Sequence, residues 1–177
     1  MSRSRTALLS AIAAITFAVT LIAPAASAAP RTTPGTAANG QCLSLTSSEV
    51  QRGLRSIGPP LGRRDLHWVP RNRSTNRTPN CPPIMFAVFD TSGGTVSSPV
   101  AVLLFRPGKY LGAANKPTGY TTASAPTPFF VQVTYRWPLP TDPNAAPSGG
   151  PVTSYFVALG DTVLRFGQLP PGVTSSY

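Results

Sequence analysis

The stretches IMFAVFD (residues 84–90) and VAVLLFR (residues 100–106) decide the fold of this chain. Both are short, continuous apolar runs rich in Val and Phe, which is typical of buried β-strands. A Gly93-Gly94 turn signal separates them. The second run shows no alternation of polar residues, so we expect a strand that is buried on both of its faces.

Further strand signals follow toward the C-terminus. After the tight turn Pro107-Gly108, we expect strands at KYLGAA (109–114), FFVQVTYRW (129–137), VTSYFVAL (152–159) and TVLRF (162–166), with a loop over 115–128. The last two strands flank Gly160-Asp161, which is a two-residue hairpin signal.

The segment FFVQVTYRW alternates with the period of a strand. One face carries Phe129, Val131, Val133, Tyr135 and Trp137. Alternating aromatic residues of this kind are usually core, although such a face also suits a groove for a sugar or a lipid.

One helix is expected before the strands. Thr46-Ser47-Ser48-Glu49 has the pattern of a capping box, in which the Glu49 carboxylate reaches back to the first residue. Val50, Leu54 and Ile57 then form a single apolar stripe, and Gly58 ends the helix. We interpret Glu49 as a capping residue in preference to a catalytic acid.

The order of these elements predicts an α+β fold. No helix lies between the strands to make parallel crossovers, so the sheet is expected to be antiparallel, with five or six strands and the N-terminal helix packed on it. We assign residues 41–170 to a single domain and residues 171–177 to a flexible tail.

The N-terminus has the pattern of a secretory signal peptide over residues 1–28. Arg3 and Arg5 precede an apolar run from Ala7 to Ala23, and Ala26-Ser27-Ala28 supplies small residues for cleavage after Ala28. An uncleaved membrane anchor is the alternative, for which the run is slightly short. We expect a disordered leader at residues 29–40 and no transmembrane anchor after cleavage.

The chain is strongly basic, with 15 Lys and Arg against 5 Asp and Glu in 177 residues. Cleavage would remove Arg3 and Arg5, which leaves 13 cations and a net charge of +8. Such a charge favours anionic partners.

Cys42 and Cys81 are the two cysteines of the chain. In an exported protein such a pair predicts a disulfide, which would close a loop of about 40 residues. Metal ligation is the alternative, but with His67 as the single histidine the ligand set is poor. We expect neither a metal nor a cofactor.

Four segments resemble the LppP/LprE lipoprotein family of actinobacterial cell envelopes. They are the stretch from Trp68 to Cys81, LLFRPGKYLGAA (103–114), V-x-V-x-Y-R (131–136) and LRFGQLP (164–170). The resemblance implies a cell-envelope or secreted protein without an assigned molecular function. The family is named for a lipidated cysteine, whereas the first cysteine here is Cys42, far from the expected cleavage site.

The sequence gives no catalytic signature. There is no G-x-S-x-G elbow, S-x-x-K motif, phosphate loop or dinucleotide fingerprint. His67 is interpreted as structural, Asp65 is expected to pair with Arg64, and Asp161 occupies a turn position that favours Asp. We therefore expect a protein that is not an enzyme.

A basic segment is the main functional lead, because seven arginines fall between Arg52 and Arg77. Arginine suits bidentate contact with phosphate or carboxylate. The predicted anion-binding surface comprises Arg63, Arg64, Arg71, Arg73, Arg77, Arg106 and Lys109. The alternative is a solvated basic face.

These observations predict a secreted or envelope-associated, non-catalytic accessory module. Its expected partner is an anionic cell-wall polymer or a lipid headgroup rather than nucleic acid. One alternative is a structural or protein-interaction module of the envelope with no ligand of its own. The other is an unrecognised hydrolase that depends on His67 or Asp65.

Overall fold

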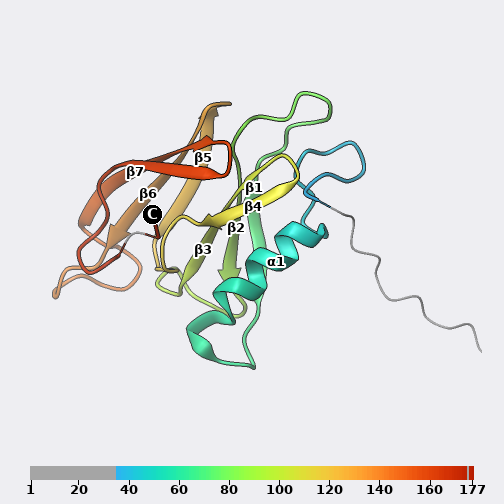
Figure 1. Cartoon of the computed structure of the whole chain (residues 1–177). Helices are drawn as coiled ribbons and strands as arrows, with labels where there is room; N and C mark the ends of the chain where they lie inside the picture. Colours follow the sequence, from blue (N-terminus) through green and yellow to red (C-terminus); the bar gives the residue numbers. More distant parts are fainter. Residues whose placement is uncertain (1–34, 175) are drawn as a thin grey trace, which may run out of the picture. The chain divides into compact units, whose positions relative to one another are not determined.

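The strands form two four-stranded antiparallel sheets, where the sequence predicted a single sheet of five or six strands (Figure 1). The computed structural model describes residues 35–174 and 176–177, so the predicted signal peptide and the cleavage site after Ala28 lie outside the described residues. The first sheet has the order β1 (Trp68–Arg73), β2 (Met85–Thr91), β3 (Val100–Arg106) and β4 (Lys109–Ala113). The second has the order β5 (Thr121–Thr127), β6 (Phe130–Trp137), β7 (Gly149–Leu159) and β8 (Thr162–Gly167).

The sheets are separate because β4 does not pair with β5, and the sequence analysis missed one strand of each sheet. β1 lies in the basic segment, where no strand was predicted, and β5 lies in the expected loop at 115–128. Each is an edge strand, pairing only with β2 or β6 respectively. With these two strands added, each sheet is complete as a four-stranded meander.

The helical part of the chain lies before β1. Helix α1 spans Ser48–Ile57, and a short 3-10 helix, η1, spans Pro60–Gly62. The N-cap of α1 is Ser47, whose hydroxyl accepts a hydrogen bond from the Val50 N–H, so the predicted capping box starting at Thr46 is wrong. Because the helix begins one residue later than predicted, the Glu49 carboxylate turns toward β4 and accepts a hydrogen bond from the Tyr110 N–H at 2.6 Å.

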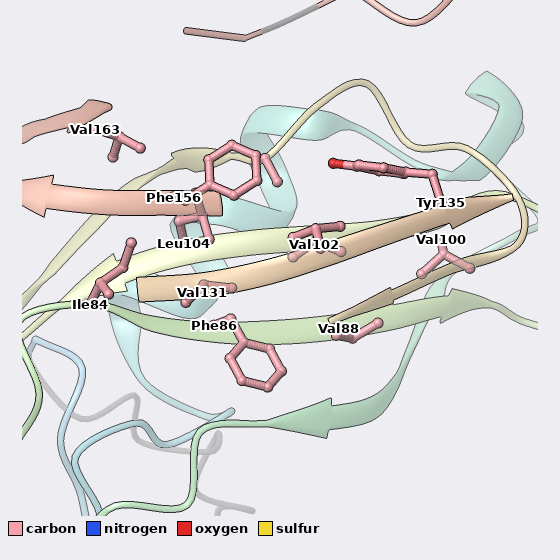
Figure 2. Close-up of a cluster of buried hydrophobic side chains, with 12 residues drawn as sticks. Ile84, Phe86, Val88, Val100, Val102, Leu104, Val131, Tyr135, Phe156 and Val163 are labelled. Carbon is pink, nitrogen blue, oxygen red and sulfur yellow. The ribbon is translucent and has the colours of Figure 1, made fainter. Parts of the chain in front are cut away.

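Two apolar clusters place the layers in the order helix, first sheet, second sheet. The larger cluster joins residues of both sheets, among them Phe86, Val102 and Phe156 (Figure 2). The other joins the helix, through Val50, to the opposite face of the first sheet, through Leu103 and other residues. All residues of β3 from Val100 to Phe105 are buried, which confirms the prediction of a strand covered on both faces.

The predicted aromatic face of residues 129–137 belongs mainly to this core. Val131, Val133 and Tyr135 are fully buried between the sheets. The two ends of the predicted face are exceptions: Phe129, which precedes β6 in a turn, is 67% exposed, and Trp137 is half-buried. The interpretation as core is therefore confirmed for the middle of the strand.

The predicted disulfide between Cys42 and Cys81 is present. It connects the segment before α1 to the segment before β2. Since these are the two cysteines of the chain, neither has a free thiol. No helix in the described part of the chain is long and apolar enough to cross a membrane.

One residue near each end of the described chain contacts the rest of the domain. Thr36, in the predicted disordered leader, is 1% exposed, and its hydroxyl accepts a hydrogen bond from the Gly108 N–H at 2.9 Å. Residues 29–34 of that leader lie outside the described residues. In the predicted flexible tail, the ring of Tyr177 lies 6.1 Å from that of Phe156.

Candidate functional site

A cleft of about 610 Å³ lies where β2 and β6 end and β3 and β5 begin. Its walls come from both sheets and from the loops that follow β2 and β6. The lining residues are Arg71, Asp90, Thr91, Gly94, Thr95, Val96, Ser98, Val100, Tyr120, Thr121, Thr122, Arg136, Ala145 and Pro147. This volume falls within the range of small-molecule binding sites.

Tyr120 connects three parts of the cleft wall. Its N–H donates to the carbonyl of Val96, its carbonyl accepts from the N–H of Arg136, and its hydroxyl donates to the carbonyl of Asn144. These bonds join the loop after β2, the end of β6 and the loop after β6. Tyr120 holds a left-handed backbone conformation with φ of 51°, a local strain that the three hydrogen bonds offset.

The residue before Tyr120 allows the two loops to approach closely. A Cβ at Gly119 would lie 2.5 Å from the carbonyl oxygen of Ser97, which is closer than van der Waals contact permits. Any other residue at Gly119 would therefore displace the loop after β2. The wall of the cleft depends on this small residue.

Arg71 is fixed by contacts on both sides of the cleft. Its guanidinium lies 3.0 Å from the Asp90 carboxylate, and it donates a hydrogen bond to the carbonyl of Thr121 in the second sheet. The charge of Arg71 is therefore balanced by Asp90. This residue shapes the cleft and connects the edge of the first sheet to the second sheet.

Arg136 differs from Arg71 because its guanidinium makes no hydrogen bond or ion pair with the described residues. It is exposed and stands at the end of β6, where the backbone is held by Tyr120. The lining has three charged side chains, those of Arg71, Asp90 and Arg136, and together they give the cleft a net positive charge. The backbone is thus fixed while the charged group is available to a ligand.

The polar part of the lining consists mainly of hydroxyl groups beside the charged side chains. Thr95, Ser98 and Thr122 add hydroxyl groups around the two arginines, and no histidine or cysteine is part of the lining. Nucleophilic catalysis by a hydroxyl requires a base within hydrogen-bond reach, and the carboxylate of this lining, that of Asp90, is paired with Arg71. Among the described residues, no three His, Cys, Asp or Glu side chains form a cluster that could hold a metal ion.

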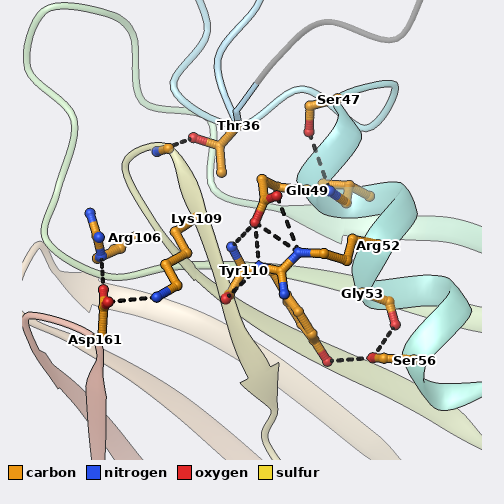
Figure 3. A network of polar contacts seen from close by, with 12 residues as sticks. Thr36, Ser47, Glu49, Arg52, Gly53, Ser56, Arg106, Lys109, Tyr110 and Asp161 are labelled. Atoms are coloured by element: carbon orange, nitrogen blue, oxygen red, sulfur yellow. Dashed lines mark hydrogen bonds and ion pairs between the residues drawn. The ribbon is translucent and has the colours of Figure 1, made fainter.

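The predicted anion-binding surface is not gathered at one place, and four of its seven cations pair with carboxylates. Arg71 lies in the cleft with Asp90, as described above. Arg106 and Lys109 both contact Asp161 at the turn between β7 and β8 (Figure 3). These contacts, that of Lys109 first, lower the pKa of the Asp161 carboxyl.

The remaining predicted cations lie on other surfaces. Arg63 pairs with Asp65 at 2.6 Å, so the expectation that Asp65 pairs with Arg64 is wrong. Arg73 donates a hydrogen bond to the side chain of Gln41. Arg64 and Arg77 are exposed and have no ion pair with the described residues.

The two residues expected to matter in a hydrolase are not assembled into a catalytic pair. The carboxylate of Asp65 is engaged by Arg63, whose hydrogen bond lowers the pKa of Asp65. His67 borders a separate groove with Trp68 and Leu54, and its backbone N–H donates to the hydroxyl of Ser92.

Sequence reasoning missed Arg136 and Tyr120 as members of the site. Arg136 is a single cation at the end of an alternating strand, and Tyr120 lies in a segment expected to be a loop. Arg136 ends the V-x-V-x-Y-R segment that resembles the family, but that pattern assigns it no role, and neither residue lies in a charge cluster. Their roles come from pairing between distant strands, which local sequence patterns do not specify.

Comparison with known proteins bears on one part of the chain. No curated protein and no solved structure matches the chain. Apart from Arg71, every residue that lines the cleft lies between residues 76 and 161. Residues 76–161 match the model of the LppP/LprE lipoprotein family, and the resemblance seen in the sequence is thereby confirmed over that region.

Proposed function

We propose that this protein is a non-catalytic, extracytoplasmic module that binds an anionic component of the cell envelope in the cleft around Arg136. The match to the LppP/LprE lipoprotein family supports the envelope association. The cleft replaces the basic segment as the proposed site, because it brings charged groups from several elements into one concavity.

The observation that carries the proposal is the unpaired guanidinium of Arg136. A ligand at Arg63, Arg71, Arg106 or Lys109 would compete with a carboxylate of the same chain. No such competition exists at Arg136 within the described residues. The Arg136 guanidinium can donate two parallel hydrogen bonds to a phosphate or carboxylate of the ligand. These bonds offset the free-energy cost of removing water from the cation.

The ligand is defined by its chemistry as a phosphate or carboxylate carried by a larger polar molecule. Thr95 and Thr122 line the same cleft and offer hydroxyls for the neutral part of such a ligand. A wall polymer and a lipid headgroup share this chemistry. Purified cell walls and anionic vesicles distinguish the two sources.

The test is co-sedimentation of the purified protein with cell walls, and separately with anionic vesicles, across a salt series. The matched variants are Arg136→Gln in the cleft and Arg64→Gln, an exposed arginine outside it. Loss of a charge-assisted hydrogen bond pair should weaken binding about tenfold or more for Arg136→Gln. Binding should also fade with added salt, because exposed charges are screened.

Equal loss in the two variants would contradict the cleft proposal and leave a diffuse basic surface as the explanation. Absence of binding at low salt would favour the structural or protein-interaction alternative. Turnover of a substrate panel that is lost on replacing His67 or Asp65 would instead support a hydrolase.

A further inference from the structure

The floor of the cleft around Arg136 consists of the buried lining residues Thr91, Val100 and Thr121. Val100 also belongs to the apolar cluster between the two sheets, so the floor is continuous with the core (Figure 2). The Thr91 hydroxyl donates its one proton to the carbonyl of Pro99 at 2.8 Å. The Thr121 hydroxyl donates to the carbonyl of Thr118 at 3.0 Å. Neither hydroxyl of the floor is therefore left to donate to an anion.

Two loops add apolar side chains to the walls of the cleft. Val96, from the loop after β2, is 59% exposed. Ala145 and Pro147 come from the loop after β6. Together with Val100 they surround one concavity from three elements. Apolar side chains grouped around a few polar groups in a concavity are typical of small-molecule sites.

These walls are held in place by hydrogen bonds within the chain. The turn that carries Val96 is closed by a bond from the Ser98 N–H to the Thr95 carbonyl at 3.0 Å. In the loop after β6, the Asp142 carboxylate accepts hydrogen bonds from two backbone N–H groups, at 2.7 Å each. Tyr120 bonds to both loops. A wall that is ordered in advance lowers the entropy cost of binding a ligand against it.

The charge and the apolar surface lie at different depths of the cleft. Arg136 is exposed, so its cation is at the rim, whereas the floor is buried. An anionic group placed on the floor would lose its water without gaining donors from Thr91 or Thr121, which is costly. A ligand that occupies the whole cleft therefore needs an anionic end at the rim and an apolar part inside.

We infer that the ligand of the cleft is a single amphiphilic lipid molecule. Its phosphate or carboxylate group binds Arg136, and its hydrocarbon part lies against the floor and against Val96 and Ala145. This inference rests on the proposed function and narrows its two sources, a wall polymer and a lipid, to the lipid. A polymer with charged or hydroxylated units along its whole length would bury polar groups on the floor without partners.

The test compares ligands that share a polar head and differ in their hydrocarbon. Glycerol phosphate and dihexanoyl phosphatidate form one pair, and acetate and octanoate form the other, each used below the concentration at which micelles form. Isothermal titration calorimetry of the purified protein measures the four dissociation constants. In at least one pair, the ligand with the hydrocarbon tail should bind about tenfold or more tightly than the ligand without it, because each buried methylene adds to affinity.

Two substitutions separate the head contact from the tail contact. Val96→Ser should weaken binding of the tailed ligand about threefold or more and leave binding of the tail-less ligand unchanged. Arg136→Gln should weaken both ligands of a pair by the same factor, because it removes only the contact with the head. Ala145→Gln is a second wall variant. Circular dichroism melts establish that each variant is folded.

The matched control is Leu61→Ser, which changes an apolar residue that is 66% exposed and lies outside the cleft. This variant should bind each ligand as the wild type does. The heat capacity change on binding the tailed ligand should be negative, as is typical of apolar burial, and smaller in magnitude in Val96→Ser.

Equal affinity for the two ligands of each pair, lost in Arg136→Gln, would overturn the lipid and leave the cleft as an anion site for a polymer. Tighter binding of a tailed ligand that both wall variants retain would place the hydrocarbon elsewhere on the molecule, and this also overturns the inference. Absence of binding for all four ligands would overturn the proposed function together with it.

Discussion

Glu49 links the helix to the first sheet through its carboxylate. It accepts hydrogen bonds from the side chain of Arg52 and from the backbone N–H of Tyr110 (Figure 3). Arg52 in turn donates to the Tyr110 carbonyl, and its guanidinium carbon lies 5.2 Å from the centre of the Tyr110 ring. The hydrogen bond with Arg52 is the main cause of a lowered pKa of Glu49, and the Tyr110 N–H contributes.

This lowered pKa makes the contribution of Glu49 to stability dependent on pH. Because the folded pKa lies below the unfolded value of about 4.3, the stabilisation is present above that pH and is lost as the pH falls through the folded pKa. We expect Glu49→Gln to lower the free energy of unfolding by about 1–2 kcal/mol at neutral pH. The two curves of unfolding free energy against pH should converge in acid. Urea unfolding across a pH series measures both effects.

The control is Asp65→Asn. The Asp65 carboxylate also pairs with an arginine, but both members of that pair are largely exposed. Exposed ion pairs contribute little, so this variant should unfold nearly as the wild type does at neutral pH. A constant difference between Glu49→Gln and the wild type at every pH would contradict the role of the Glu49 charge.

At the scale of elements, Gly53 sets how closely α1 approaches the first sheet. A Cβ at this position would lie 2.9 Å from both Leu103 Cδ1 and Tyr110 Cε2, and those two side chains are buried. Glycine inside a helix costs about 1 kcal/mol relative to alanine. Here that cost is offset by the close packing of helix on sheet.

We expect Gly53→Val to lower the free energy of unfolding by about 1–3 kcal/mol, because the new side chain overpacks a filled core. Arg55→Val tests the same side chain at an exposed position of the same helix and should change stability by less than about 0.5 kcal/mol. Chemical unfolding monitored by circular dichroism measures both variants. Because valine has a higher helix propensity than glycine, a Gly53→Val variant at least as stable as the wild type would mean that helix propensity, rather than packing, decides the outcome.

The elements that the sequence predicted correctly are those with a strong apolar signal. β3 was predicted at residues 100–106 and is found there, because an uninterrupted apolar run has few alternatives to a buried strand. β1, with the sequence WVPRNR, and β5, with the sequence TTASAPT, were missed. Both are edge strands that contain proline and few buried side chains, so tertiary pairing rather than local pattern determines them.

The sequence predicted less of the candidate site than of the fold. Among the predicted cations, Arg71 lies in the cleft, whereas Arg106 and Lys109 are paired with Asp161 elsewhere. A charge cluster in sequence does not reveal which cations the fold neutralises. Arg136 was missed for the same reason, since its lack of a partner is a property of the folded chain.

At the scale of the whole molecule, the cleft depends on the contact between the two sheets. Arg71 stands on the edge strand of the first sheet and donates a hydrogen bond to the carbonyl of Thr121 in the second sheet. Anion binding at Arg136 should weaken as the salt concentration rises, because salt screens exposed charges.

The disulfide constrains the part of the chain that precedes the central strands. Cys42 and Cys81 are 39 residues apart, and the loop that they close contains α1, η1 and β1. The helical layer and one edge strand are thus constrained by the bond, whereas β2 to β8 lie outside the loop. The larger core, between the two sheets, does not include either cysteine.

We therefore expect the Cys42→Ala, Cys81→Ala double variant to lose about 4 kcal/mol of unfolding free energy, the chain-entropy cost of a loop of this length. The loss of stability should differ between parts of the molecule. Amide hydrogen exchange should accelerate most in α1 and β1, and least in β6 and β7, whose inward residues fill the core between the sheets. Uniform acceleration across both sheets would instead mean that the helical layer and the two-sheet core unfold as one cooperative unit.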